Sequence, residues 1–253
     1  MNFRRRFLYF LRQLGFDPIL TWRAIVALPK FLRDLIIFTQ KNGLKGIRLS
    51  PNIQDYFDNS GVTDGHYFWQ DLIVAKWIFE QNPSTHLDIG SRLDGFVAHL
   101  LTFREVEIID IRPAKNRIPN LVTHVGDATG KIQATKEEYE SVSSLHSIEH
   151  FGLGRYGDPI RLNGHYEGLL SIAGKVKLGG ILYVSFPIGK PVTEFNSQRV
   201  LDPMWAIDVL TKFDILDFVL IPWTGSPEYG VNPRDVCKDV QGQAGIYKFV
   251  RIA

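Results

Sequence analysis

The sequence contains little cysteine and has no long uninterrupted apolar segment. Cys237 is the single cysteine among 253 residues, which excludes an intramolecular disulfide and an all-cysteine metal site and is typical of a reducing compartment. The most apolar stretch, residues 19–38, is interrupted by four charged residues, from Arg23 to Asp34. No span of about 18 apolar residues remains for a transmembrane helix, and the start lacks the small-residue cleavage site of a signal peptide. We therefore expect a cytoplasmic protein.

The net charge is small but unevenly distributed. The chain has 29 basic and 27 acidic residues, a formal net charge of +2. Residues 1–50 alone carry ten basic and two acidic side chains, a net charge of +8, which leaves −6 for the remainder. Because the basic excess is confined to this arm and the body of the chain is acidic, nucleic-acid binding is not indicated.

The basic arm has the pattern of amphipathic helices. Residues 2–14 interleave phenylalanine and leucine with arginine at helical spacing, and a second such stretch runs from Thr21 to Gln40, interrupted by Pro29. Such helices are typical of peripheral membrane binding, where each basic residue contributes about 1 kcal/mol near an anionic leaflet. The alternative is a helical cap packed on the main domain. We predict a basic helical extension over residues 1–60, with peripheral contact of residues 1–40 at the inner membrane face as one of these two interpretations.

The chain is organised around residues 85–95, Thr-His-Leu-Asp-Ile-Gly-Ser-Arg-Leu-Asp-Gly. An apolar run ends in Asp88-x-Gly90, and a short turn leads into a helix-like pattern. A second short strand ends in Asp110, 22 positions after Asp88. At this spacing a nucleoside-binding α/β fold places a carboxylate beside the ribose hydroxyls. The pattern therefore predicts a nucleoside-containing cofactor.

The turn differs from a dinucleotide fingerprint. A pyrophosphate requires G-x-G-x-x-G, because the backbone and a helix N-terminus must approach the phosphates closely. Here Arg92 and Asp94 stand where further glycines would be, and the carboxylate of Asp94 would repel a pyrophosphate. A dinucleotide or nucleotide-sugar enzyme is therefore disfavoured, and a cofactor with an amino acid tail and no phosphate fits better.

The chain resembles the class I S-adenosylmethionine-dependent methyltransferases over residues 66–252. Their first motif is Asp-x-Gly-x-Gly-x-Gly, of which Asp88, Gly90 and a displaced Gly95 are present. The resemblance implies an α/β fold with a Rossmann-like, doubly wound, mostly parallel seven-stranded sheet and an antiparallel last strand, in a domain over residues 61–253. The more particular strings are similar to a bacterial methyltransferase-like subfamily, some members of which are associated with surface-polysaccharide biosynthesis.

The resemblance also implies the cofactor contacts. By position they are Asp88, Gly90, Ser91, Arg92, Asp110, Ile111, Asp127 and Ala128. The acid at the end of the second strand, Asp110, would bind the ribose of S-adenosylmethionine, and Ile111 would lie along the base. In the Gly-Asp-Ala sequence after the third strand, Asp127 would face the adenine amino group.

The densest titratable cluster is His146-x-x-Glu149-His150, at the end of the predicted fourth strand. One histidine could act as a general base that takes the proton of a substrate hydroxyl. Alternatively, all three side chains could hold a divalent metal that orients the hydroxyl. The ubiquinone-pathway O-methyltransferases, which this stretch resembles, carry Glu-x-x-Glu-His here and use a divalent metal, and His146 replaces the first glutamate.

The same letters spell the H-x-x-E-H of inverted zinc proteases. That site requires both histidines on one long helix, whereas a β-like run precedes His146, and Gly152 and Gly154 follow soon after. A protease is therefore disfavoured. The loop beyond carries Arg155, Tyr156 and Asp158, which could bind a sugar or phosphate group or could pin the loop to the sheet.

Together these patterns predict an S-adenosylmethionine-dependent methyltransferase that acts on oxygen of a sugar, a glycan or a similar hydroxylated small molecule. The altered glycine turn around Arg92 motivates a second hypothesis. In it the fold is catalytically degenerate, and the protein is a binding or scaffold partner that acts through its basic N-terminal helices.

Overall fold

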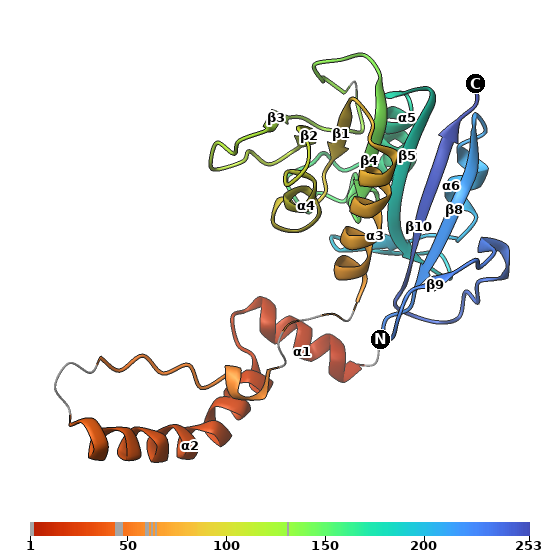
Figure 1. Ribbon diagram of the computed structural model, residues 1–253. Coiled ribbons are helices and arrows are strands. Elements are labelled where there is room, and N and C mark those ends of the chain that lie inside the picture. The colour runs from red at the N-terminus through yellow and green to blue at the C-terminus, as the bar shows by residue number, and fades with distance from the viewer. Residues whose placement is uncertain (1–2, 44–47, 59–60, 62, 64, 131) are drawn as a thin grey trace. The chain divides into compact units, whose positions relative to one another are not determined.

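The computed structural model (Figure 1) describes most of the chain. The described residues are 3–43, 48–58, 61, 63, 65–130 and 132–253. The chain forms two compact units, Met1–Val62 and Thr63–Ala253. Every strand found in the described residues belongs to the C-terminal unit.

The N-terminal unit consists of two helices and a short 3₁₀ turn. Helix α1 spans Phe3–Gln13, helix α2 spans Pro18–Asn42, and the turn η1 spans Asp55–Phe57. Asp17 begins α2, because its carboxylate accepts hydrogen bonds of 2.9 and 3.1 Å from the backbone N–H groups two and three positions further on. The helix ends at Gly43, whose φ of +69° favours glycine.

Pro29 lies inside α2 and does not end it, although its position in the sequence suggested an interruption. A proline has no N–H and so removes one helical hydrogen bond, and the helix tolerates this loss. Among the described helices, α2 included, none combines the length and the apolar character that crossing a bilayer requires.

The C-terminal unit is built on an eight-stranded sheet with the order β3-β2-β1-β4-β5-β10-β8-β9. Strands β1 to β5 pair in parallel, whereas β10 is antiparallel to both β5 and β8. The strands are β1 (His86–Ile89), β2 (Val106–Asp110), β3 (Leu121–Val125), β4 (Tyr139–Leu145), β5 (Val176–Ile188), β8 (Phe213–Ile221), β9 (Glu228–Tyr229) and β10 (Gln243–Arg251). The predicted Rossmann-like, mostly parallel sheet with an antiparallel last strand is confirmed. The two-residue strand β9 extends the predicted seven strands at one edge.

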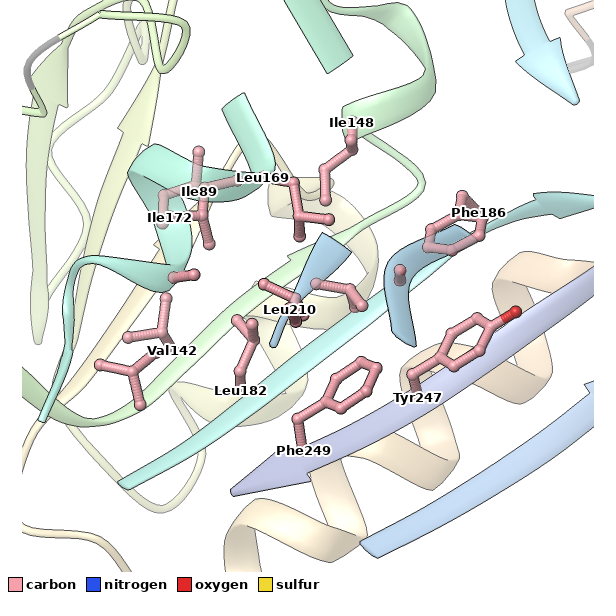
Figure 2. Close-up of a cluster of buried hydrophobic side chains, with 14 of the residues drawn as sticks. Ile89, Val142, Ile148, Leu169, Ile172, Leu182, Phe186, Leu210, Tyr247 and Phe249 are labelled. Atoms are coloured by element: carbon pink, nitrogen blue, oxygen red, sulfur yellow. The ribbon is translucent and has the colours of Figure 1, made fainter. Parts of the chain in front are cut away.

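Helices cover both faces of this sheet. The helical elements are α3 (His66–Gln81), η2 (Leu93–Val97), α4 (Ala98–Leu100), η3 (Ile148–His150), α5 (Gly164–Ala173), α6 (Trp205–Val209) and η4 (Pro233–Asp235). One buried cluster joins α3 and η2 to the sheet and includes Ile78, Phe96 and Tyr183. The cluster in Figure 2 joins α5 to the other face and includes Leu169 and Leu182. Successive side chains of a strand point to opposite faces, so Leu182 and Tyr183 of β5 belong to different clusters.

A small hairpin outside the main sheet completes this unit. Its strands are β6 (Val192–Glu194) and β7 (Gln198–Val200), and Leu201, just after β7, forms a parallel bridge with Ile188 at the end of β5. The turn of this hairpin contains Ser197, which contacts the candidate site described below. The four parallel strands β1 to β4 end at the same edge of the sheet, which is where ligands bind in open α/β folds.

Candidate functional site

A cleft of about 670 Å³ lies at the carboxyl ends of these parallel strands. This volume falls in the range of small-molecule and cofactor sites. Of the eight predicted cofactor residues, seven line it: Gly90, Ser91, Arg92, Asp110, Ile111, Asp127 and Ala128. His146 and His150 line it as well, so the structure brings the predicted cofactor residues and two members of the predicted catalytic cluster to one cavity.

Asp88 is the predicted cofactor residue that does not line the cleft, and the expectation of a direct contact is corrected. Its side chain is completely buried beneath the turn that follows β1. The carboxylate accepts hydrogen bonds from the backbone N–H (3.1 Å) and hydroxyl (2.7 Å) of Ser91 and from the hydroxyl of Ser143 (2.6 Å). Asp88 therefore stabilises the turn through hydrogen bonds to Ser91 and does not reach the cleft.

The turn itself depends on Gly90. Its φ of +74° is in the left-handed region, and an added Cβ would lie 2.1 Å from the Ser147 hydroxyl oxygen. The next residues do not follow a glycine-rich path. Arg92 donates two hydrogen bonds to Asp94, of 3.1 and 2.9 Å, on the exposed side of the turn. The charge of Asp94 is therefore paired, and its predicted repulsion of a pyrophosphate is weaker than an isolated acid would exert.

Both carboxylate oxygens of Asp110 accept hydrogen bonds from Arg112. Oδ1 accepts from the backbone N–H (2.7 Å) and Nε (2.9 Å) of Arg112, and Oδ2 accepts from a terminal guanidinium nitrogen of the same residue (2.8 Å). The guanidinium also lies 4.3 Å from the ring centroid of Tyr156, a cation–π contact. A carboxylate has about four lone-pair positions, and Arg112 uses three of them.

Only one of the two carboxylate oxygens of Asp127 accepts hydrogen bonds from described residues. Oδ1 accepts hydrogen bonds from the backbone N–H (2.8 Å) and the hydroxyl (2.7 Å) of Thr129. Within the described part of the chain no donor bonds to Oδ2, and the residue lines the cleft. This carboxylate is therefore fixed in orientation and keeps an acceptor for a ligand N–H, which fits the role implied for it.

His146 and Glu149 form a buried pair at the end of β4. His146 Nδ1 lies 2.8 Å from Glu149 Oε1, and the two side chains are 4% and 1% exposed. Because a carboxylate accepts, we infer that Nδ1 carries the proton. In a neutral imidazole with this tautomer, Nε2 is the acceptor. No described residue bonds to Nε2 or to the second carboxylate oxygen of Glu149. Burial would raise the pKa of Glu149, but its interactions with His146, followed by those with His150 and with a backbone N–H, together outweigh burial and lower that pKa.

Two residues of α3 support the His146 ring, and neither was among the predicted site residues. The His66 ring stacks on it at 5.0 Å between centroids with an interplanar angle of 2°, and the Tyr67 ring lies 5.1 Å away. His66 Nε2 donates to the carbonyl oxygen of Gly242 (2.9 Å). Burial, together with the nearby His146, lowers the pKa of His66 to about 4, so this ring is neutral at pH 7. Tyr67 also lines the cleft.

The metal interpretation of His146, Glu149 and His150 is not supported. Among the described residues no group of three histidine, cysteine or acidic side chains is arranged to hold a metal ion. His150 Nε2 is 3.7 Å from the same Glu149 oxygen that His146 contacts, and its Nδ1 donates to the carbonyl oxygen of Ser197 (2.6 Å). These partners account for the positions of the three side chains without a metal.

The loop after His150 is pinned by its own acid. Asp158 accepts hydrogen bonds from the backbone N–H groups of Gly154 (3.0 Å) and Tyr156 (3.1 Å), and both bonds lie within the loop itself. Arg155 donates to the carbonyl oxygen of Ser197 (3.1 Å) and lies 5.1 Å from the Tyr156 ring centroid. Tyr156 thus receives the guanidinium groups of both Arg112 and Arg155.

The sheet order and the cleft define a class I methyltransferase-like fold, and solved structures share it. One is an S-adenosylmethionine-dependent methyltransferase from Clostridium acetobutylicum ATCC 824, with a TM-score of 0.51, 12% identity, and coverage of 76% of this chain and 94% of that one. A putative methyltransferase from Bacillus halodurans C-125 has a TM-score of 0.50, 13% identity, and coverage of 73% and 100%. The [4+2]-cyclase SpnF has a TM-score of 0.52, 12% identity, and coverage of 75% and 88%. Likeness at this identity establishes the fold alone.

The sequence itself matches a family model over residues 93–220, which is 128 of the 253 residues. The family is described as Caenorhabditis protein of unknown function, DUF268. The chain belongs to the DUF268 family. Among curated proteins none matches the sequence. Membership of the bacterial, polysaccharide-associated subfamily stays a prediction.

The buried Asp88 predicts a pH dependence of stability. Burial raises the pKa of Asp88 to about 6, against 3.8 for the ordinary carboxyl group, and the serine hydrogen bonds oppose this only in part. The folded state therefore binds the proton more tightly than the unfolded state, and this contribution is complete below pH 4 and is lost as the pH rises through 6. The loss is of the order of 3 kcal/mol.

Urea unfolding of Asp88→Asn from pH 4 to pH 7 should show a flatter stability profile than that of the parent protein, because the side chain no longer titrates. Glu105→Gln, at an exposed acid, is the control and should leave the profile unchanged. Parallel profiles for Asp88→Asn and the parent protein would contradict the assignment.

Proposed function

We propose that this protein is an S-adenosylmethionine-dependent methyltransferase that methylates oxygen of a sugar, a glycan or a similar hydroxylated substrate. The observation that carries the proposal is the cleft itself, because Gly90, Asp110, Asp127 and His146 all line it. S-adenosylmethionine would supply an electrophilic methyl group. The residues around it have to bind an adenosine and take a proton from the acceptor.

The cofactor residues suit an adenosine without phosphates. Asp110 at the end of β2 is placed for ribose hydroxyls, and Asp127 at the end of β3 offers a free acceptor for the adenine amino group. The cleft is lined by four acidic side chains (Asp94, Asp110, Asp127 and Asp158) and by four lysine or arginine side chains (Arg92, Arg112, Lys115 and Arg155). Without a positive excess, a pyrophosphate gains little here, whereas an amino acid tail has partners of both signs.

The base we assign is His146. Glu149 holds the proton on Nδ1, which leaves the Nε2 lone pair to accept the hydroxyl proton of the acceptor as its oxygen attacks the methyl group. The carboxylate then stabilises the imidazolium that forms. Glu149 acts through His146 and is a positioning residue. This arrangement favours an oxygen acceptor, because an alcohol is a weak nucleophile until its proton is removed.

The second candidate is a catalytically degenerate member of the fold that binds a ligand without transferring a methyl group. Two observations favour it. The side chain of Arg112 donates hydrogen bonds to Asp110, the acid proposed to bind the ribose. The paired Arg92 and Asp94 stand in place of the glycines of the turn. SpnF, which shares this fold, is described as a [4+2]-cyclase and not as a methyltransferase. Binding and transfer must therefore be measured separately.

Calorimetric titration with S-adenosylhomocysteine tests the binding half. We expect saturable binding, weakened about 10- to 100-fold in Asp110→Ala, because a hydrogen bond to a charged group contributes about 1.5–3 kcal/mol. The control is Glu105→Ala, at an exposed acid that does not line the cleft, and its affinity should stay close to that of the parent protein. Absence of heat with the parent protein, or equal affinity in Asp110→Ala, would remove the proposal.

Arg112 should compete with the cofactor for Asp110. A ribose diol offers two hydroxyls, and only about one lone-pair position of the carboxylate is left, so Arg112 must give up at least one of its hydrogen bonds. Arg112→Met should therefore bind S-adenosylhomocysteine about two- to fivefold more tightly, the scale of an exposed ion pair. Arg155→Met is the control, because Arg155 contacts the same Tyr156 ring without bonding Asp110. Weaker binding in Arg112→Met would show instead that Arg112 contacts the ligand.

The methyl-transfer part of the proposal is tested with S-adenosylmethionine that carries tritium in its methyl group. Transfer of the label is measured to a panel of hexoses, uronic acids and nucleotide sugars. With an accepted sugar, His146→Ala should lower kcat by about 100-fold or more, the scale of general base catalysis, while S-adenosylhomocysteine affinity is retained. Glu149→Gln keeps a hydrogen-bond acceptor for Nδ1 and should lower kcat less, with a shifted pH profile. Binding of S-adenosylhomocysteine with no labelled product from any acceptor would favour the degenerate alternative.

A further inference from the structure

The exposed face of helix α2 is apolar. Trp22, Ile25, Leu32 and Ile36 are 65%, 58%, 47% and 55% exposed. Their separations of three, seven and four residues place them on one side of the helix. Scattered apolar side chains are ordinary on protein surfaces, but a continuous stripe of this kind marks an interaction surface. We call these four residues the α2 apolar face.

The opposite side of α2 is the one that packs within the N-terminal unit. Ala27 is 3% exposed. Lys30 Nζ lies 5.0 Å from the ring centroid of Tyr56 in η1, and Arg23 pairs with Asp58 at 3.3 Å. A helix on a globular core turns its apolar side inward. Here the side with charged residues makes the contacts within the unit, although Arg23 and Lys30 stay 39% and 43% exposed. The α2 apolar face is left without a partner in the described part of this unit.

The charge of the same unit selects the kind of partner. Residues 1–62 carry ten basic and four acidic side chains, a net charge of +6, whereas the rest of the chain carries −4. Arg33 lies at the edge of the α2 apolar face; its side chain is 68% exposed and pairs with Asp34 at 3.2 Å. An apolar stripe on a unit of net positive charge matches an anionic lipid surface, where acyl chains and headgroups meet both features. A second copy of the unit would bring a charge of the same sign and is disfavoured.

We propose that helix α2 lies in the plane of an anionic membrane surface, with the α2 apolar face at the boundary between headgroups and acyl chains. Trp22 is suited to this depth, because its ring is apolar while its N–H needs a polar partner. The proposal concerns the N-terminal unit and does not depend on the methyltransferase activity.

Sedimentation of the full chain with phospholipid vesicles tests this. The protein should pellet with phosphatidylcholine vesicles that contain phosphatidylserine, less with phosphatidylcholine alone, and less as salt is raised. Ile25→Glu combined with Leu32→Glu should weaken vesicle binding more than tenfold, since two large side chains lose their apolar contact. The control is Leu162→Glu, at an 87% exposed position in the C-terminal unit, which should bind as the parent protein does.

Any of four outcomes would overturn the proposal. The parent protein remains in the supernatant with phosphatidylserine vesicles, or the double variant pellets as well as the parent. Light scattering detects a dimer that the double variant loses, which assigns the face to a second copy. The double variant melts at a lower temperature while neither protein binds vesicles, which assigns the face to the protein's own packing. S-adenosylhomocysteine affinity, measured on the same samples, reports separately on the proposed function.

Discussion

The candidate site depends on the hydrogen bonds that stabilise one buried carboxylate, that of Asp88. Ionised Asp88 has no access to water and would be very costly without hydrogen bonds, and it takes three of them from Ser91 and Ser143. The Ser91 hydroxyl also accepts a hydrogen bond from the backbone N–H of Leu145 (3.0 Å). One network therefore joins the turn after β1 to the end of β4. Because His146 follows directly, the turn that would carry the cofactor and the histidine that would take the proton are held by the same acid.

The fold was predictable because its signals are local, whereas the roles of individual side chains were not. A strand that ends in Asp-x-Gly and a second strand that ends in an acid can each be recognised from a few consecutive residues. Because the strands are parallel, they bring Asp110 and Asp127 to the same edge of the sheet. The pattern does not tell which acid faces the cleft and which lies beneath the turn, so Asp88 was assigned to the wrong side. His66 was missed because its stacking on His146 joins positions 80 residues apart, a contact that only tertiary packing creates.

Charge pairing at close spacing was the other feature beyond the reach of sequence patterns. Asp94 and Asp110 each pair with an arginine two residues away, although each reads in sequence as a free acid. The case against a pyrophosphate consequently rests less on repulsion by Asp94 than on the missing glycines and on the balanced charge of the cleft. In the proposed site, a ribose diol would have to displace part of the pairing between Asp110 and Arg112. The affinity for an adenosine would then depend on this competition as well as on the acid.

The backbone at His146 bears on whether the site is catalytic or degenerate. Its φ of +46° is unusual for a residue with a side chain, and such conformations cost about 1–3 kcal/mol. The conformation persists because the backbone N–H of His146 donates to the Ser185 carbonyl oxygen (2.9 Å), while Glu149 and His66 hold the ring. A glycine at position 146 would adopt this backbone conformation without strain, so the turn alone does not require a histidine. The proposed proton transfer would make use of a strained imidazole that is held in one orientation, whereas the proposed degenerate scaffold would have no use for it.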